Sequence, residues 1–188
     1  MVTFVFPEVQ AQVLDVEADL TLPPGIHTYE SIIVHNGATL TLQSDPLAGA
    51  GVTLETASMT VEAGASVSAA GTGFTPGGGP GGSTSDRVGA AHGGRGGGTT
   101  STTIVYGSAI RPLTLGSGGS GGTGAGGGAV RLVIAGLLQL DGTLTASATG
   151  RSHAGGSILI EAERVQGAGH IQANGSPGDC PSCTATFP

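Results

Sequence analysis

Four polar residues in one glycine-rich stretch carry side chains that could do chemistry: Asp86, His92, Arg95 and Tyr106. A histidine near an aspartate can act as a general base, and an arginine can neutralise a carboxylate or phosphate on a substrate. Tyrosine with arginine and histidine also suits a lyase that removes a proton beside an arginine-bound uronate. The alternative is structural, because glycine-rich backbone leaves many carbonyl groups in need of donors. We predict structural roles first, and keep these four as the candidate catalytic residues of an enzyme.

The histidines give little sign of a metal site. His27, His35, His153 and His170 are scattered, and no two lie at close ligand spacing. One CxxC pair cannot supply the four ligands of a structural zinc. A site assembled from His92, His153 and the cysteines is the remaining alternative. We therefore predict no metal and no cofactor.

Cys180 and Cys183 form a CxxC pair near the end of the sequence. A redox motif of this type is expected where a strand leads into a helix, because the helix N-terminus lowers the thiol pKa. The residues that follow, Thr-Ala-Thr-Phe-Pro, do not favour a helix. The pair is therefore predicted to form a local disulfide, which suits an oxidising compartment.

The stretch 71–128 contains most of the 37 glycines. Ordering glycine costs much backbone entropy, so a flexible linker is one interpretation. However, the stretch also contains apolar residues such as Ile104, Val105 and Ile110, which look suited to packing. Glycine also permits close approach of two backbones. We therefore expect an ordered excursion in which extended, polyproline-like segments lie side by side.

The composition restricts the fold and the partners. Only 3 % of the 188 residues are aromatic, so the core must be aliphatic, which favours stacked thin layers. The net charge is −7 and the basic residues form no run, which argues against nucleic acid and anionic membranes. No apolar run approaches the ~20 residues that span a bilayer. The first residues are not a signal peptide, so secretion would require a signal removed from a longer chain.

Three segments, 51–71, 129–150 and 157–175, can be laid over one another. Each reads as short alternating strands separated by breaks and ending in glycine, over roughly 20 residues, as in solenoid repeats. In the first, strands are expected at 52–54, 59–61 and 67–69. Only 161–165 leaves room for a short helix. If the segments stack, the glycine-rich stretch, the loop of Arg151 and His153 and the cysteine loop leave from one corner.

This overlay defines the expected organisation of the chain. His92, Arg95, Tyr106, Arg151 and His153 become the candidate binding residues at the shared corner. We predict a single all-β domain, a parallel β-solenoid expected to be right-handed. Its parts are an N-terminal cap with the first strands at 1–25, first coils at 26–70, the glycine-rich insertion at 71–128, last coils at 129–176 and a C-terminal tail at 177–188.

An ordered set of motifs supports this prediction. It comprises His92-Gly-Gly-Arg-Gly-Gly, Tyr106-Gly-Ser, Leu115-Gly-Ser-Gly-Gly, Gly126-Gly-Gly-Ala-Val-Arg-Leu and, in the flanks, Gly169-His-Ile-Gln-Ala-Asn-Gly. Over roughly residues 26–178 the sequence resembles the glycine-rich β-solenoid modules of large secreted and cell-surface proteins. The resemblance implies a structural or adhesive module, whose partners are other copies of itself or cell-surface polysaccharide. It implies no catalytic mechanism.

Two other functions stay open. A carbohydrate-active enzyme or carbohydrate-binding module would use the glycine-rich corner. An ice-binding protein would use ranks of threonine on a flat face. The strand threonines show no constant offset along the sequence, and outward threonine usually reflects β-propensity. These threonines are Thr39, Thr41, Thr53, Thr60, Thr143 and Thr145.

Overall fold

The computed structural model describes residues 12–85, 88–98, 103–120 and 122–178. These residues form ten strands and contain no helix, so none of them belongs to a helix that could span a membrane. The strands are β1 Val13–Val16, β2 Leu20–Leu22, β3 Gly25–Val34, β4 Thr39–Leu42, β5 Val52–Val61, β6 Ser66–Ser68, β7 Ala129–Leu140, β8 Thr143–Thr145, β9 Ser157–Gln166 and β10 His170–Gln172.

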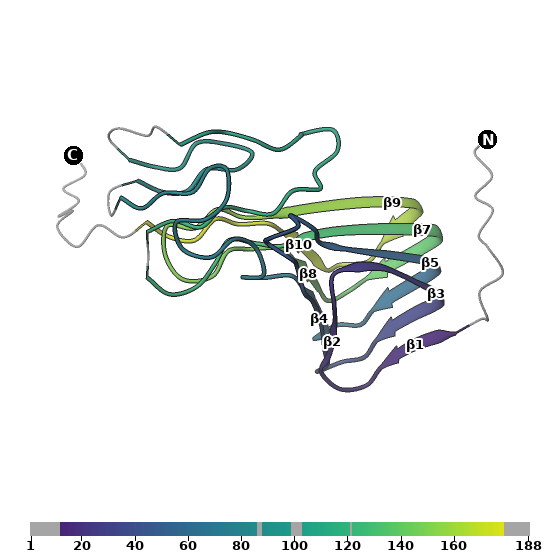
Figure 1. Ribbon diagram of the computed structural model, residues 1–188. Helices are drawn as coiled ribbons and strands as arrows, with labels where there is room; N and C mark the ends of the chain where they lie inside the picture. The colour runs from purple at the N-terminus through teal and green to yellow at the C-terminus, as the bar shows by residue number, and fades with distance from the viewer. Residues whose placement is uncertain (1–11, 86–87, 99–102, 121, 179–188) are drawn as a thin grey trace, which may run out of the picture.

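The strands form two parallel sheets. The first has the order β1-β3-β5-β7-β9, and the second has the order β10-β8-β6-β4-β2. The chain visits the two sheets in alternation, and each new strand lies beside the previous strand of the same sheet (Figure 1). The prediction of an all-β, parallel arrangement is therefore confirmed.

The strands of the first sheet are longer than the sequence indicates. β5 is one strand of 10 residues where two short strands were expected. The expected break is an irregularity, because the register against β7 shifts between Thr56 and Met59. Thr56 is buried there, and its hydroxyl donates to the Glu30 and Ser58 carbonyls at 3.1 and 3.0 Å. The segment 161–165 is likewise not helical but lies within β9.

The core lies between the two sheets and is aliphatic, as predicted. Ile32, Met59 and Leu138 occupy matching positions on β3, β5 and β7, and each is at most 1 % exposed. Matching positions on the second sheet carry similar residues, such as Leu40 and Val67. Burying an aliphatic side chain of this kind contributes about 1.5–3 kcal/mol. Stacked columns of medium-sized apolar residues thus fill the core without large aromatic side chains.

The predicted overlay of the three segments is confirmed by strand pairing. Val52 of β5 pairs with Val130 of β7, which pairs with Ile158 of β9. The repeat is longer than the roughly 20 residues expected, since Thr28 on β3 pairs with Glu55, 27 residues further along. The difference is the loop before β5, which the overlay did not count.

The glycine-rich segments pack together beside the sheets (Figure 1). We call the described parts of 71–128, 146–156 and 173–178 the glycine-rich body. Backbone hydrogen bonds connect its extended segments: Gly73 donates to the Gly126 carbonyl at 2.7 Å, and Gly126 donates to the Phe74 carbonyl at 2.9 Å. Gly127 donates in turn to the Ala154 carbonyl at 3.0 Å. The excursion is therefore packed against the rest of the chain, as expected of a docked segment and not of a linker.

Glycine is needed where these segments meet. A Cβ added at Gly126 would lie 2.0 Å from the Gly116 carbonyl oxygen, and one at Gly127 would lie 1.8 Å from the Ala146 oxygen. Real Cβ atoms do not approach backbone oxygens so closely. The glycine-rich body is therefore held by backbone packed directly on backbone, which only glycine permits.

Candidate functional site

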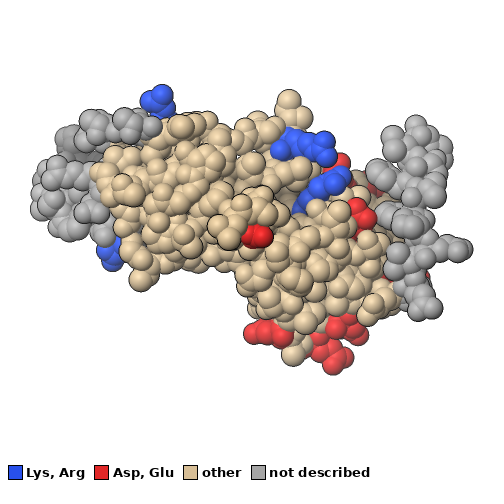
Figure 2. Space-filling model, viewed as in Figure 1, with Lys and Arg blue, Asp and Glu red and all other residues tan. Residues whose placement is uncertain are grey.

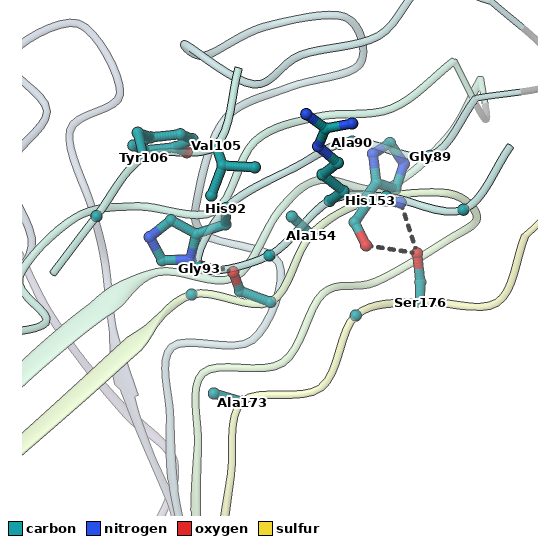
Figure 3. Close-up of a pocket in the computed structure, with 18 of the residues that line it drawn as sticks. Gly89, Ala90, His92, Gly93, Val105, Tyr106, His153, Ala154, Ala173 and Ser176 are labelled. Atoms are coloured by element: carbon teal, nitrogen blue, oxygen red, sulfur yellow. Dashed lines mark hydrogen bonds between the residues drawn. The ribbon is translucent and has the colours of Figure 1, made fainter. Parts of the chain in front are cut away.

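One cleft brings most of the predicted site residues together (Figure 3). It has a volume of about 1290 Å³ and is lined by residues from 88–98 and 105–112 and by residues from 152–157 and 173–178. Its lining includes His92, Arg95, Tyr106 and His153. The prediction that the glycine-rich stretch and the Arg151–His153 loop are neighbours is therefore confirmed.

Of the remaining candidates, only Arg151 belongs to the described residues. Arg151 is exposed and does not line the cleft, although Ser152 beside it does. Asp86, Cys180 and Cys183 lie outside the described residues, so the predicted Asp86–His92 pairing and the predicted disulfide stay predictions. The loop that leads toward the cysteines does reach the corner, because the Ser152 N–H donates to the Pro177 carbonyl at 2.7 Å.

Both ring nitrogens of His92 are engaged by the protein. Nδ1 lies 2.8 Å from the Gly155 carbonyl oxygen, so Nδ1 carries the proton and donates. Nε2 lies 2.7 Å from the Thr114 hydroxyl and accepts its proton. Burial lowers the pKa of His92, while the bond to Gly155 opposes that shift, which agrees with a neutral ring. The nitrogen that a general base would use is therefore already occupied.

Tyr106 is held just as firmly. Its hydroxyl donates to the Leu115 carbonyl at 2.5 Å and lies 2.7 Å from the Ser117 hydroxyl. Burial raises the pKa of Tyr106, while the Ser117 bond opposes that shift. Its ring lies beside that of His92, with centroids 4.9 Å apart and planes tilted by 51° (Figure 3). A raised pKa and a donated proton do not suit proton abstraction at neutral pH.

His153 is a buried structural residue, 2 % exposed. Its Nδ1 accepts the Gly119 N–H at 2.8 Å, and its Nε2 donates to the Thr123 carbonyl at 3.2 Å. The Ser176 hydroxyl accepts a hydrogen bond from the His153 backbone N–H at 2.8 Å (Figure 3). The imidazole thus joins its own loop to the stretch that contains Gly119 and Thr123, whereas the sequence had marked His153 as a candidate binding residue.

The His92–Thr114 pair has the spacing of a base and a nucleophile, but its placement does not suit catalysis. Thr114 does not line the cleft, so a substrate in the cleft would not meet its hydroxyl. The backbone carbonyl of Thr114 is also occupied, since it accepts the Ser157 hydroxyl at 2.7 Å. We infer that the pair joins two segments of the glycine-rich body.

Arg95 differs from its neighbours. Its side chain is exposed, and within the described part of the chain it makes no hydrogen bond or ion pair. No aspartate or glutamate occurs among the described lining residues. Figure 2 shows that, on the face in view, most acidic side chains lie over the sheets and few charges lie over the glycine-rich body. The cleft therefore offers an unpaired cation to a ligand.

Sequence reasoning missed the partners that fix these side chains, Thr114, Ser117 and Ser176. No motif surrounds them, and each lies in a run of small residues like many others in the chain. For metals, the described residues contain no group of three or more histidine, cysteine or acidic side chains placed to hold an ion. The alternative site using His92 and His153 lacks support there, because the ring nitrogens of both residues are engaged.

Strand pairing corrects the expectation that the strand threonines form no aligned rows. On the second sheet, strand pairing aligns Thr39 with Ser66 and Thr143, although the sequence offsets looked irregular. A second rank runs through Thr21, Thr41, Ser68 and Thr145. Thr53 and Thr60 lie on β5 of the first sheet and belong to neither rank. The ranks end at His170 and Gln172 on β10.

Two histidines give the stability of the fold opposite dependences on pH. His35 lies between Asp15, at 2.6 Å, and Glu62, at 3.2 Å, and its pKa is raised, chiefly by the hydrogen bond to Asp15. A raised pKa stabilises the fold at pH values below the pKa of the unfolded state, about 6.5. This stabilisation is lost as the pH rises through the pKa of the folded state. The lowered pKa of His92 acts on the other side, since stability falls as pH drops below about 6.5.

We therefore expect the free energy of unfolding to pass through a maximum near pH 6.5. His35→Gln should flatten the alkaline limb, and His92→Gln should flatten the acid limb. Urea unfolding measured from acid to alkaline pH would test both variants. Limbs that stay unchanged in the two variants would show that these histidines do not set the pH dependence.

Comparison of the chain with protein-family models, with curated proteins and with solved structures returned no match.

Proposed function

We propose that this chain is an extracellular adhesive module with β-solenoid architecture. The alternation of the chain between two parallel sheets, with each strand beside its predecessor, supports a solenoid. In such a fold the loops between strands can lengthen without disturbing the stack, and the glycine-rich insertion between β6 and β7 is of that kind. The two sheets would act as a scaffold and the glycine-rich body would carry the contact surface.

One observation carries the choice of adhesion over catalysis. In the cleft, the histidine and tyrosine side chains that could transfer protons are all held by structural hydrogen bonds. Among the described lining residues, Arg95 carries a charge and makes no hydrogen bond or ion pair, so it can bind a ligand but is a poor proton acceptor. A cleft of this kind favours retention of a ligand without chemical change.

Apolar residues beside the cleft fit an adhesive surface. Ile104 and Val105 are 66 % and 46 % exposed, and Ile110 is 93 % exposed. The expectation that these side chains pack is therefore wrong, because they lie exposed on the glycine-rich body. Exposed apolar groups grouped near a binding cleft are typical of contact sites. The disulfide predicted for Cys180 and Cys183 would suit the oxidising compartment that this function requires.

The test is retention of polysaccharide without degradation. The purified chain is immobilised and offered a panel of acidic and neutral polysaccharides, and the recovered polymer is assayed for chain length and for unsaturated uronate. We expect at least one polymer to be retained and recovered intact. Retention of none, or shortened polymer, would contradict the adhesive function. The second of these results would favour an enzyme.

Self-assembly is supported by the end of the strand stack. Among the described residues, β9 and β10 are each paired on one side only, and Val165 and Ile171 on them are both 51 % exposed. Unpaired edges of this kind favour addition of a further chain. Sedimentation velocity over a wide range of protein concentration tests this. A sedimentation coefficient that rises with concentration supports stacking of copies, and a constant monomer value argues against it.

Ice binding is the second candidate function, favoured by the in-register hydroxyl ranks on β4, β6 and β8. Hydroxyls repeat there at the strand spacing of about 4.8 Å, as on other parallel sheets. Thermal hysteresis of the protein solution tests it directly. A hysteresis gap abolished by Thr41→Tyr would support ice binding, whereas freezing without a gap would exclude it.

A further inference from the structure

Four glycines of the body have no structural reason to be glycine. At Gly93, Gly94, Gly97 and Gly178, an added Cβ would have no atom of the described residues within 4 Å, and the backbone is not in the left-handed region. At most other described glycines of the body, a positive φ or a neighbouring atom closer than about 3 Å opposes a side chain, as at Gly126. The fold itself would therefore accept side chains at these four positions.

All four of these glycines line the same cleft. Glycine at a position that its own chain leaves open is what a site needs when a ligand must approach the backbone closely. The N–H groups of Gly93, Gly94 and Gly97 donate no hydrogen bond within the described residues. This part of the cleft wall is therefore backbone without side chains. Its N–H groups donate no bond within the described residues, and it lies next to the guanidinium of Arg95.

Size and chemistry indicate the ligand. The cleft volume of about 1290 Å³ exceeds the range of about 300–1,000 Å³ usual for small-molecule pockets, which favours a chain-like ligand. Backbone amides and the lining hydroxyl of Ser108 can both donate and accept, as the hydroxyls of a sugar do. The planar guanidinium of Arg95 adds parallel N–H donors that match the two oxygens of a carboxylate.

We propose that the cleft binds an acidic polysaccharide, with a uronate carboxylate on Arg95 and sugar hydroxyls on the bare backbone of Gly93, Gly94 and Gly97. This inference rests on the adhesive function and names its ligand class. The sugar is held and not cleaved, because His92 and Tyr106 beside it are committed to the protein's own bonds. An acidic peptide offers the carboxylate but fewer groups that both donate and accept.

The test compares matched variants against polygalacturonate, its methyl ester and polyglutamate. Arg95→Gln should weaken polygalacturonate binding about tenfold, the loss expected for a hydrogen-bonded charge. Arg111→Gln is the control, because Arg111 is also exposed but does not line the cleft, and should change the Kd by less than about twofold. Gly94→Ala should weaken binding about fivefold or more while the Tm stays level or rises.

Each result decides one point. Equal effects of Arg95→Gln and Arg111→Gln, or no effect of Gly94→Ala, would overturn the cleft assignment. If the unmodified chain still retained polysaccharide, adhesion itself would stand. Equal affinity for the methyl ester would overturn the carboxylate contact, and binding of polyglutamate alone would overturn the polysaccharide in favour of an acidic peptide. Retention of no polymer at all would contradict both the proposed ligand and the proposed adhesive function.

Discussion

Replacing Gly126 by alanine is expected to destabilise the protein by about 3 kcal/mol, the upper range for overpacking. The added Cβ would lie 2.0 Å from the Gly116 oxygen and 2.4 Å from the Gly116 carbonyl carbon. Neither chain can easily move away, because Gly126 is bonded to Gly73 and Phe74 through its own oxygen and N–H. Urea unfolding would measure the loss.

Gly93→Ala is the matched control for this prediction. The substitution is chemically identical, but the Cβ at Gly93 points into open space and the φ is ordinary. We expect a change within about 0.5 kcal/mol, or a gain of up to about 1 kcal/mol from the less flexible unfolded chain. Equal stability of the Gly126→Ala variant and the unmodified protein would show that the segments are not packed backbone on backbone.

His153→Leu is expected to cost about 2–3 kcal/mol. Leucine has similar bulk but leaves the buried Gly119 N–H without its acceptor, and it removes the donor to the Thr123 carbonyl. Because the N–H is buried, water cannot easily replace the lost bond. Chemical denaturation monitored by the amide resonances of the glycine-rich body would report the change.

His153→Asn separates hydrogen bonding from packing in this prediction. The asparagine carbonyl can take the place of Nδ1 and accept the Gly119 N–H, so we expect it to recover about half of the lost stability. His170→Leu on the exposed strand β10 is the surface control and should change stability by less than about 0.5 kcal/mol. Equal losses for leucine and asparagine at position 153 would mean that His153 acts by shape alone.

Much of the architecture could be predicted from the sequence because its causes are local. Alternation of apolar residues on short segments ended by glycine predicts strands, and the similarity of 51–71, 129–150 and 157–175 predicts that they pair. The pairing of Val52, Val130 and Ile158 bears this out. The meeting of the glycine-rich stretch with the His153 loop followed from the same overlay, because each departs at an equivalent point.

What could not be predicted has no local pattern. The stretch around Thr56 looks like a turn in sequence, yet its hydroxyl satisfies two carbonyls and lets β5 continue. Thr114 and Ser117 resemble many other small polar residues, and only the folded path of the glycine-rich segments brings them to His92 and Tyr106. The hydroxyl ranks were missed because their alignment depends on strand register across loops of unequal length.

The cleft also combines features that could be predicted from the sequence with features that could not. Its candidate residues Arg95, His92 and Tyr106 could be singled out by chemistry, but whether each was free or engaged depended on bonds that the sequence does not reveal. Likewise, glycines needed for packing and glycines left open cannot be told apart in a stretch so rich in glycine. Gly94 and Gly126 look alike until their surroundings are known.

Residue-resolved amide hydrogen exchange over 71–128 tests the central claim, that this segment is an ordered body held by its own backbone bonds, most directly. We predict slow exchange at bonded amides such as Gly73, Gly118 and Gly126, and fast exchange at Gly93 and Gly94, which donate no bond in the described structure. Addition of polygalacturonate should then slow exchange at Gly93 and Gly94. Rapid exchange throughout the segment would contradict an ordered body and leave two sheets joined by a flexible loop.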